Sequence, residues 1–147
     1  MLPLIAWVNL AALPSKESHV LYVAGESQSG NDFDLQFESD DNLRFYTSGG
    51  GHVSYAPDPH TLVNQWHMIL ATMDTVAPNK VIYWDGQPAA NDQLPNEPQK
   101  TAQFTIGESP VFTGRFFDGG IDEVALWNRA LSAADVAAIY KAATTKP

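Results

Sequence analysis

The sequence predicts an all-β fold, a two-sheet antiparallel sandwich with one short C-terminal helix. Ten glycines and ten prolines divide the 147 residues into segments of the length of antiparallel strands joined by turns. Several segments alternate apolar and polar residues with a period of two, which favours one buried and one solvated face. The last segment instead places apolar residues at helical spacing. A chain of this length can bury a sizeable core, so we expect a single domain over residues 1–147.

Nine segments have the length and composition of strands, which is enough for two packed sheets. They are residues 4–10, 20–25, 32–38, 42–47, 52–56, 66–74, 80–85, 102–107 and 120–128. The clearest alternation lies in the third, where Phe33, Leu35 and Phe37 alternate with acidic and amide residues. We therefore expect these three side chains to face the core.

Two short polar sequences predict tight hairpin turns. Residues 40–42 and the pair Asp85 and Gly86 tolerate the positive φ that such turns require. The stretch that follows, residues 86–101, contains three prolines and several polar residues. We expect it to be a surface loop rather than a strand.

The C-terminal helix has the best-marked start. Ser132 is a suitable N-cap, and Asp135 follows three residues later as in a capping box. Leu131 and Val136 occupy the two positions that pack together as a hydrophobic staple. The sequence thus predicts a helix that begins directly after Ser132.

Composition excludes several classes of function. The net charge of −9 and the lack of a basic cluster argue against nucleic acid as a partner. The absence of cysteine excludes thiolate chemistry and disulfides. No run is apolar enough for a membrane span, and the apolar start, residues 1–13, lacks the basic flank of a signal peptide, so we interpret it as a strand.

Five segments carry a recognisable pattern in a fixed order along the chain, namely residues 4–8, 66–72, 83–86, 104–107 and 117–132. Together they resemble the laminin-G-like family of the concanavalin A-like jelly-roll fold. The resemblance implies a jelly-roll sandwich with one concave sheet, in a family of lectin, glucanase, adhesion and pentraxin-like modules that are often extracellular or on the cell surface. Such a fold does not imply one function. Trp7, Trp66 and Trp127 lie in the matching segments, and we expect their indoles between the sheets.

The resemblance also implies that strands usually preceding residues 4–10 are missing. Removing a strand while keeping its neighbours leaves unpaired backbone groups along a sheet edge. We therefore expect a homodimer that forms through an exposed edge. The alternative is a monomer whose edge is covered by residues 86–101 or by the C-terminal helix.

The function that the sequence favours is a non-catalytic recognition module. Its ligand would be a glycan or a protein, bound through the concave sheet and its loops, because aromatic faces stack on sugars and planar polar groups bond their hydroxyls. Strand parity and the resemblance place Trp84 inward, and Arg44, Tyr46 and Tyr83 together on one solvent-facing surface. The candidate ligand-binding residues are Arg44, Tyr46, His52, Tyr55 and Tyr83.

Two alternatives stay open, a catalytic jelly roll (glycoside hydrolase or lyase) and a structural or assembly domain. Retaining jelly-roll hydrolases carry their acids in a Glu-x-Asp-x-Glu pattern on one strand face, and no such pattern occurs here. Asp122 and Glu123 are adjacent, so in a regular strand they point to opposite faces. No nucleophile elbow or phosphate loop is present either, and we expect no catalytic residues.

Calcium is the candidate cofactor. Some members of the family that the chain resembles hold calcium near the strand matching residues 119–122, which makes Asp122 the candidate metal ligand. The four histidines lack the spacing of zinc sites. Zinc is therefore not expected.

Overall fold

The computed structural model describes residues 3–14, 21–25, 33–47, 51–74, 79–93, 104–109, 112–129 and 131–145. These residues form ten strands and two helices. In chain order they are β1 (Leu4–Leu10), β2 (Leu21–Gly25), β3 (Phe33–Phe37), β4 (Leu43–Thr47), β5 (His52–Tyr55), α1 (Pro59–Leu62), β6 (His67–Asp74), β7 (Asn79–Trp84), β8 (Gln87–Asp92), β9 (Thr105–Ile106), β10 (Gly119–Leu126) and α2 (Ala133–Thr144). Among them, no helix is long and apolar enough to cross a membrane.

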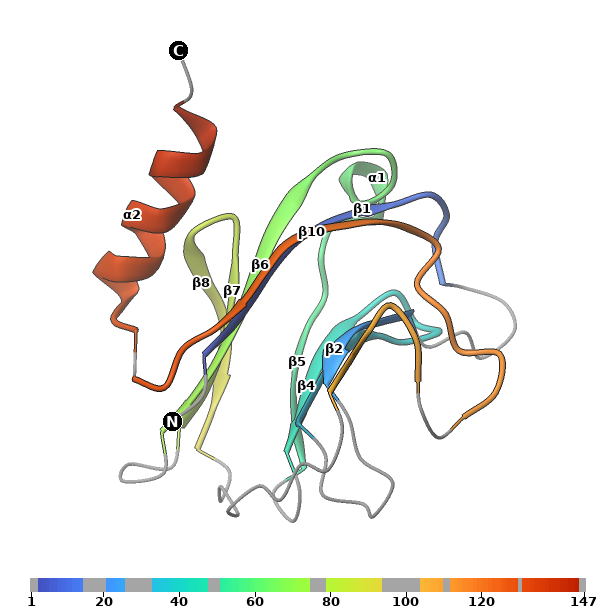
Figure 1. The fold of residues 1–147 in the computed structure, drawn as a ribbon, viewed down its shortest axis with the longest axis horizontal. Coiled ribbons are helices and arrows are strands. Elements are labelled where there is room, and N and C mark those ends of the chain that lie inside the picture. Colours follow the sequence, from blue (N-terminus) through green and yellow to red (C-terminus); the bar gives the residue numbers. More distant parts are fainter. Residues whose placement is uncertain are drawn as a thin grey trace.

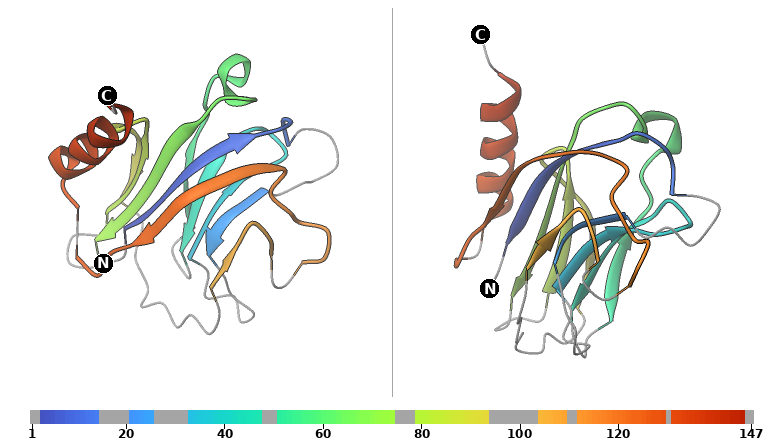
Figure 2. Two further views of the ribbon diagram at one scale, coloured as in Figure 1. Left: turned by 45° about the horizontal axis from the view of Figure 1, so that its top comes forward. Right: turned by 45° about the vertical axis from the view of Figure 1, so that its right-hand side comes forward.

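The strands form two antiparallel sheets that pack face to face (Figure 1). The first sheet has the order β10-β1-β6-β7-β8 and the second the order β5-β4-β3-β2-β9. Helix α2 lies on the side of the first sheet that faces away from the second, as the two views of Figure 2 show. The predicted all-β sandwich with one C-terminal helix is confirmed.

The core between the sheets follows the alternation seen in the sequence. Leu35 and Phe37 of β3 pair in register with Phe45 and Leu43 of β4, and all four side chains are fully buried. The first sheet contributes to the same cluster, with Leu4, Ala6, Val8, Leu10, Ile69, Ala71, Met73 and Ile82. Trp84 packs against this cluster, its ring 6.4 Å from that of Phe37, so its inward orientation is confirmed.

A second apolar layer lies between the first sheet and α2. The capping box at Ser132 and Asp135 starts the helix as predicted. The staple residues Leu131 and Val136 are buried there together with Ile5, Met68, Leu70 and Tyr83. The indole of Trp7 stacks on Tyr140 of the helix at 5.8 Å and 13°.

This second layer corrects the placement of the tryptophans. Trp7 and Trp127 pack against the cluster beneath α2 rather than between the sheets. Trp66 is not in a core at all, since 49% of its surface is exposed. The sequence pattern identifies which segments build the fold, but an indole on either face of a strand satisfies that pattern.

The stretch expected to be a surface loop contains an edge strand. Asp85 and Gly86 form a tight turn with φ of 48° and 79°, and the chain returns along β7 as β8. An edge strand tolerates Pro88 because it forms ladder hydrogen bonds on one side only. Its polar side chains are mostly exposed. Residues 94–101 of that stretch lie outside the described part of the chain, as do residues 20, 32, 102 and 103 of the expected strands.

Candidate functional site

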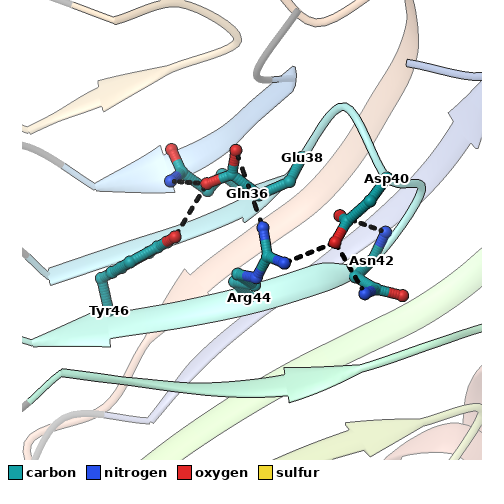
Figure 3. Close-up of polar contacts among 6 residues, drawn as sticks. All are labelled: Gln36, Glu38, Asp40, Asn42, Arg44 and Tyr46. Carbon is teal, nitrogen blue, oxygen red and sulfur yellow. Dashed lines mark hydrogen bonds and ion pairs between the residues drawn. The ribbon is translucent and has the colours of Figure 1, made fainter. Parts of the chain in front are cut away.

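A polar network covers the outer face of the second sheet, where β3 and β4 run side by side (Figure 3). It follows from strand parity, because Gln36 pairs in register with Arg44 and Asp34 pairs with Tyr46. Their neighbours in the sequence point into the core. The outward positions are therefore free to carry charge and hydrogen-bonding groups.

Glu38 is the centre of this network. Its Oε1 accepts hydrogen bonds from Gln36 Nε2 at 2.9 Å and from the Tyr46 hydroxyl at 2.8 Å. Its Oε2 lies 3.8 Å from a terminal nitrogen of Arg44. One carboxylate thus fixes an amide, a phenol and a guanidinium on the same sheet face.

The β3–β4 turn extends the network to a second carboxylate. Asp40 Oδ2 accepts from Arg44 and, at 3.0 Å, from Asn42 Nδ2, while its Oδ1 accepts from the Asn42 amide. Slight desolvation acts in the opposite direction, but the Asn42 amide and the charge of Arg44 lower the pKa of Asp40 below its ordinary value. Arg44 is therefore held between the carboxylates of Glu38 and Asp40, in a geometry that suits recognition of polar ligands.

Tyr46 and His52 form the aromatic end of the network. Their ring centroids are 4.7 Å apart, and His52 is exposed on β5. Burial, with the hydrogen bond and charge of Glu38, raises the pKa of Tyr46 to about 12. The phenol therefore stays protonated and acts as a donor to Glu38.

Two polar side chains on this face are nearly fully buried. Asp34 is 6% exposed and Gln36 is 5% exposed. Within the described part of the chain, Gln36 Oε1 and Arg44 Nε have no hydrogen-bond partner. Buried polar atoms without partners are uncommon in folded proteins, so each of these two atoms is a candidate to bind a further polar group.

Three of the five candidate ligand-binding residues, Arg44, Tyr46 and His52, come together on this face. Tyr55 does not, because it pairs in register with Leu43 and so faces inward, where it contacts Trp84 at 5.5 Å. Tyr55, predicted as a ligand-binding residue, therefore does not belong to the surface that the other three form.

Tyr83 is also misplaced by the sequence analysis. It lies on β7 of the other sheet and is 6% exposed, buried beneath α2. The expected surface shared by Arg44, Tyr46 and Tyr83 does not exist, since Tyr83 belongs to the opposite layer. The family resemblance assigned Tyr83 correctly to an outer face, but only the tertiary structure shows that a helix covers that face.

The carboxylates that organise the site, Glu38 and Asp40, were not among the binding residues predicted from the sequence. The sequence did contain a signal for Glu38, because Glu38 and Gln36 lie on the same face as Asp34 in the alternating segment. A polar stripe on a strand is usually solvated surface. Its role here depends on the pairing of β3 with β4, which brings Arg44 and Tyr46 against it.

Asp122 lies on β10, opposite Trp7 of β1. Its Oδ1 accepts from the Glu123 amide at 2.7 Å. In the described residues, no three or more His, Asp or Glu side chains gather in a way that could hold a metal ion. Calcium binding by Asp122 stays a prediction.

The expectation that Asp122 and Glu123 point to opposite faces is wrong. Glu123 has a φ of 49°, and the register between β1 and β10 shifts at this point. Such a bulge breaks the alternation of the strand and redirects a side chain. Both acidic residues consequently line one pocket.

A second polar cluster supports the fold beside the Asp85–Gly86 turn. His67 Nδ1 lies 2.8 Å from Asp85 Oδ2, and His67 Nε2 lies 2.9 Å from the Thr61 carbonyl oxygen. Asp85 Oδ1 accepts from the Met68 amide at 2.9 Å. With His67 only 7% exposed, this cluster joins α1, β6 and the turn rather than offering a ligand surface.

The fold is shared with several solved structures. A candidate carbohydrate-binding protein from Bacteroides ovatus matches with a TM-score of 0.72 at 21% identity, over 92% of this chain and 39% of its own. A heptameric SAP-like pentraxin from Limulus polyphemus matches with a TM-score of 0.69 at 16% identity, over 99% and 72%. The receptor-binding domain of botulinum neurotoxin type G matches with a TM-score of 0.74 at 12% identity, over 97% and 38%.

These likenesses concern the fold, and the chain spans about two fifths of the length of the first of these proteins. A search of curated protein sequences finds no match. The family model of the concanavalin A-like lectin/glucanases superfamily matches residues 4–137. The chain therefore belongs to the concanavalin A-like lectin/glucanase superfamily, in its laminin-G-like branch.

Proposed function

We propose that the chain is a non-catalytic binding module that recognises a glycan through the outer face of β3, β4 and β5. The main structural support for this proposal is the network that fixes Arg44, Tyr46 and Gln36 around the Glu38 carboxylate. The partly exposed Arg44 guanidinium can donate to sugar hydroxyls and the Glu38 carboxylate can accept from them, while the buried Gln36 amide holds that carboxylate in place. The Tyr46 and His52 rings supply an apolar surface beside them.

The comparisons support a binding module in general. Similar folds occur in a candidate carbohydrate-binding protein, in a pentraxin and in a toxin receptor-binding domain. A glycan is favoured over a protein ligand because the face is polar and prearranged. These residues do not form the apolar hot spot that is typical of the centre of a protein interface.

Binding of the purified protein to a glycan array, with and without calcium, is the first test. Each glycan that binds is then titrated calorimetrically against Arg44→Ala and Tyr46→Phe. Loss of a hydrogen bond to a charged group costs about 1.5–3 kcal/mol, so Arg44→Ala should weaken binding about 10- to 150-fold. Tyr55→Phe is the matched control, because Tyr55 is on the same sheet but faces inward.

Two results would overturn the proposal. The first is that no glycan on the array binds. The second is that Arg44→Ala, folded as shown by an unchanged melting temperature, still binds the glycan with full affinity. Glycans that bind are also incubated with the protein and analysed for cleavage. Release of a shorter sugar would show that the module is the catalytic alternative.

We also propose that two copies associate through a sheet edge. In the described strands, β10 and β9 are edge strands of their sheets and carry exposed Leu126 and Ile106, with 45% and 48% of their surfaces accessible. Light scattering over a range of concentrations tests this pairing. The mass of a single chain at every concentration would refute it, and Ile106→Lys should dissociate a dimer that uses β9.

A further inference from the structure

A pocket of about 240 Å³ opens on the outer side of the first sheet, beside the end of α2. It is lined by Trp7, Trp66, Asp122, Glu123 and Ala143. It belongs to the layer opposite the Glu38 network, since Trp7 and Asp122 lie on β1 and β10. It is therefore independent of the surface proposed for glycan binding.

One indole at the wall of the pocket, that of Trp7, is held in a fixed orientation by the fold. Trp7 faces outward from β1, directly across from Asp122 in the register of β10. One side of its ring is stacked on Tyr140 of α2 at 5.8 Å and 13°. An aromatic pair of this kind fixes the plane of the indole before any ligand arrives.

The second indole, that of Trp66, packs over a glycine, Gly120. A Cβ added at Gly120 would lie 2.8 Å from the Cη2 atom of Trp66, so the ring lies directly over the position where any other residue would carry its side chain. Trp66 nevertheless keeps 49% of its surface exposed. A large aromatic side chain that is positioned over the sheet but left half exposed has a surface available for a ligand.

A bulge brings the two carboxylates to the same pocket. Glu123 adopts a φ of 49°, and its amide donates to Asp122 Oδ1 at 2.7 Å. A positive φ is unfavourable for a glutamate, and bulges that redirect side chains are common beside binding sites. Of the described residues that line the pocket, none is basic.

We propose that this pocket binds an organic cation, an alkylammonium group enclosed by Trp7 and Trp66 and neutralised by Asp122 and Glu123. Aromatic faces attract cations, and indole does so more strongly than the other rings. A volume below the usual 300–1,000 Å³ of ligand pockets suits a single small group rather than an oligosaccharide. The net charge of −9 adds a long-range attraction for cations.

Methyl-substituted ammonium groups fit this chemistry better than a primary amine. A primary ammonium is a compact, strongly hydrated charge, and it loses much of its hydration when it contacts an aromatic surface. A trimethylammonium group presents methyl groups to the indoles and keeps its positive charge near the carboxylates. The group can belong to a free small molecule or to a trimethylated lysine.

The test compares two probes of the same shape that differ in charge. The full chain is titrated with the 2-hydroxyethyl-trimethylammonium ion and with 3,3-dimethylbutan-1-ol, while tryptophan fluorescence and calorimetric heat are recorded. We expect the cation to bind at least about fivefold more tightly than the neutral alcohol, and more weakly at high salt. Equal binding of the two probes, or binding of neither, would overturn the proposal.

Variants locate the binding at this pocket. Asp122→Asn removes one charge and can still accept the Glu123 amide through its side-chain oxygen, so the bulge is retained. Asp118→Asn is the matched control, since Asp118 is exposed and does not line the pocket. Asp122→Asn and Trp66→Leu should each weaken cation binding about fivefold or more, and Asp118→Asn should not. Equal effects of the two aspartate variants would mean general charge attraction and would refute the site.

A last measurement distinguishes the two sources of the cation. A short neutral peptide that carries one trimethyl-lysine is compared with the free ion. Tighter binding of the peptide indicates a modified protein as the ligand, and equal or weaker binding indicates a small molecule. Failure of this pocket leaves the glycan proposal untouched, because the variants of the two surfaces lie on opposite sheets.

Discussion

His67 is clamped between two acceptors, and this arrangement predicts a pH-dependent contribution to stability. Both ring nitrogens face an oxygen, at 2.8 Å from the Asp85 carboxylate and at 2.9 Å from the Thr61 carbonyl. Only the protonated imidazolium donates to both at once. Burial alone lowers the pKa of His67, but the hydrogen bonds with Asp85 and Thr61 and the charge of Asp85 raise it above its usual value.

The direction of the pH effect follows from this raised pKa. The ring is protonated more readily in the folded chain than in the unfolded chain, where its pKa is about 6.5. The clamp therefore contributes its full stability below about pH 6.5. The contribution is lost as the pH rises through the folded pKa.

His67→Phe tests the magnitude. Phenylalanine keeps the ring contact with Trp84, now at 4.6 Å, but removes both donors. Below about pH 6.5 the ring is charged, so both hydrogen bonds involve a charged group; at about 1.5–3 kcal/mol each, the variant should lose about 3–6 kcal/mol there. At higher pH the difference from the wild type should shrink, because a neutral imidazole donates only once.

Urea unfolding followed by circular dichroism at about pH 5.5 and about pH 8.5, on either side of the usual histidine pKa, measures both quantities. His52→Phe is the control, since His52 is exposed and has no such clamp. If the difference in unfolding free energy between wild type and His67→Phe is the same at the two pH values, the clamp does not titrate as argued. A loss below 1 kcal/mol at the lower pH would refute the magnitude, because it is smaller than one ordinary hydrogen bond.

Three further perturbations follow from single contacts. Gly86→Ala should lower the melting temperature strongly, since φ is 79° and the new Cβ would lie 2.7 Å from the Cβ of Tyr140; an unchanged melt would show that the turn and helix separate easily. Ser132→Ala should cost about 0.5–2 kcal/mol in urea unfolding, because it removes the N-cap of α2, and no loss would mean that the cap is dispensable. If Asp122 holds calcium, saturation a hundredfold above Kd should add about 2.7 kcal/mol to stability, and identical melts with calcium and with chelator would exclude it.

Elements defined by local patterns were predictable from the sequence. The alternation of Leu35 and Phe37 fixed which face of β3 is buried, and Ser132 fixed the start of α2. Strand β8 was not predictable in this way. Its polar residues and Pro88 are typical of a loop, and it is a strand because the Asp85–Gly86 turn returns it to an edge of the sheet.

The candidate site was predicted in part, and the errors have one cause. Parity separates inward from outward positions, which placed Arg44 and Tyr46 correctly on an outer face. It does not say which outer face belongs to which sheet, or what covers it. Tyr83, which the family resemblance placed on an outer face, is buried because α2, distant in the sequence, packs on that face.

Helix α2 also decides where the first sheet can bind a ligand. It covers the outer side chains of β6 and β7, where Met68, Leu70 and Tyr83 are buried beneath it. Its last turn ends beside β1 and β10, with Ala143 at the wall of the pocket. The same helix therefore covers the half of the outer face that β6 and β7 form. Through Tyr140 it also orients the indole of Trp7, which lies on β1 in the uncovered half. A shift of α2 would disturb the cation pocket and leave the Glu38 network unchanged, since that network contains only residues of β3, β4, β5 and the turn between β3 and β4, all in the second sheet.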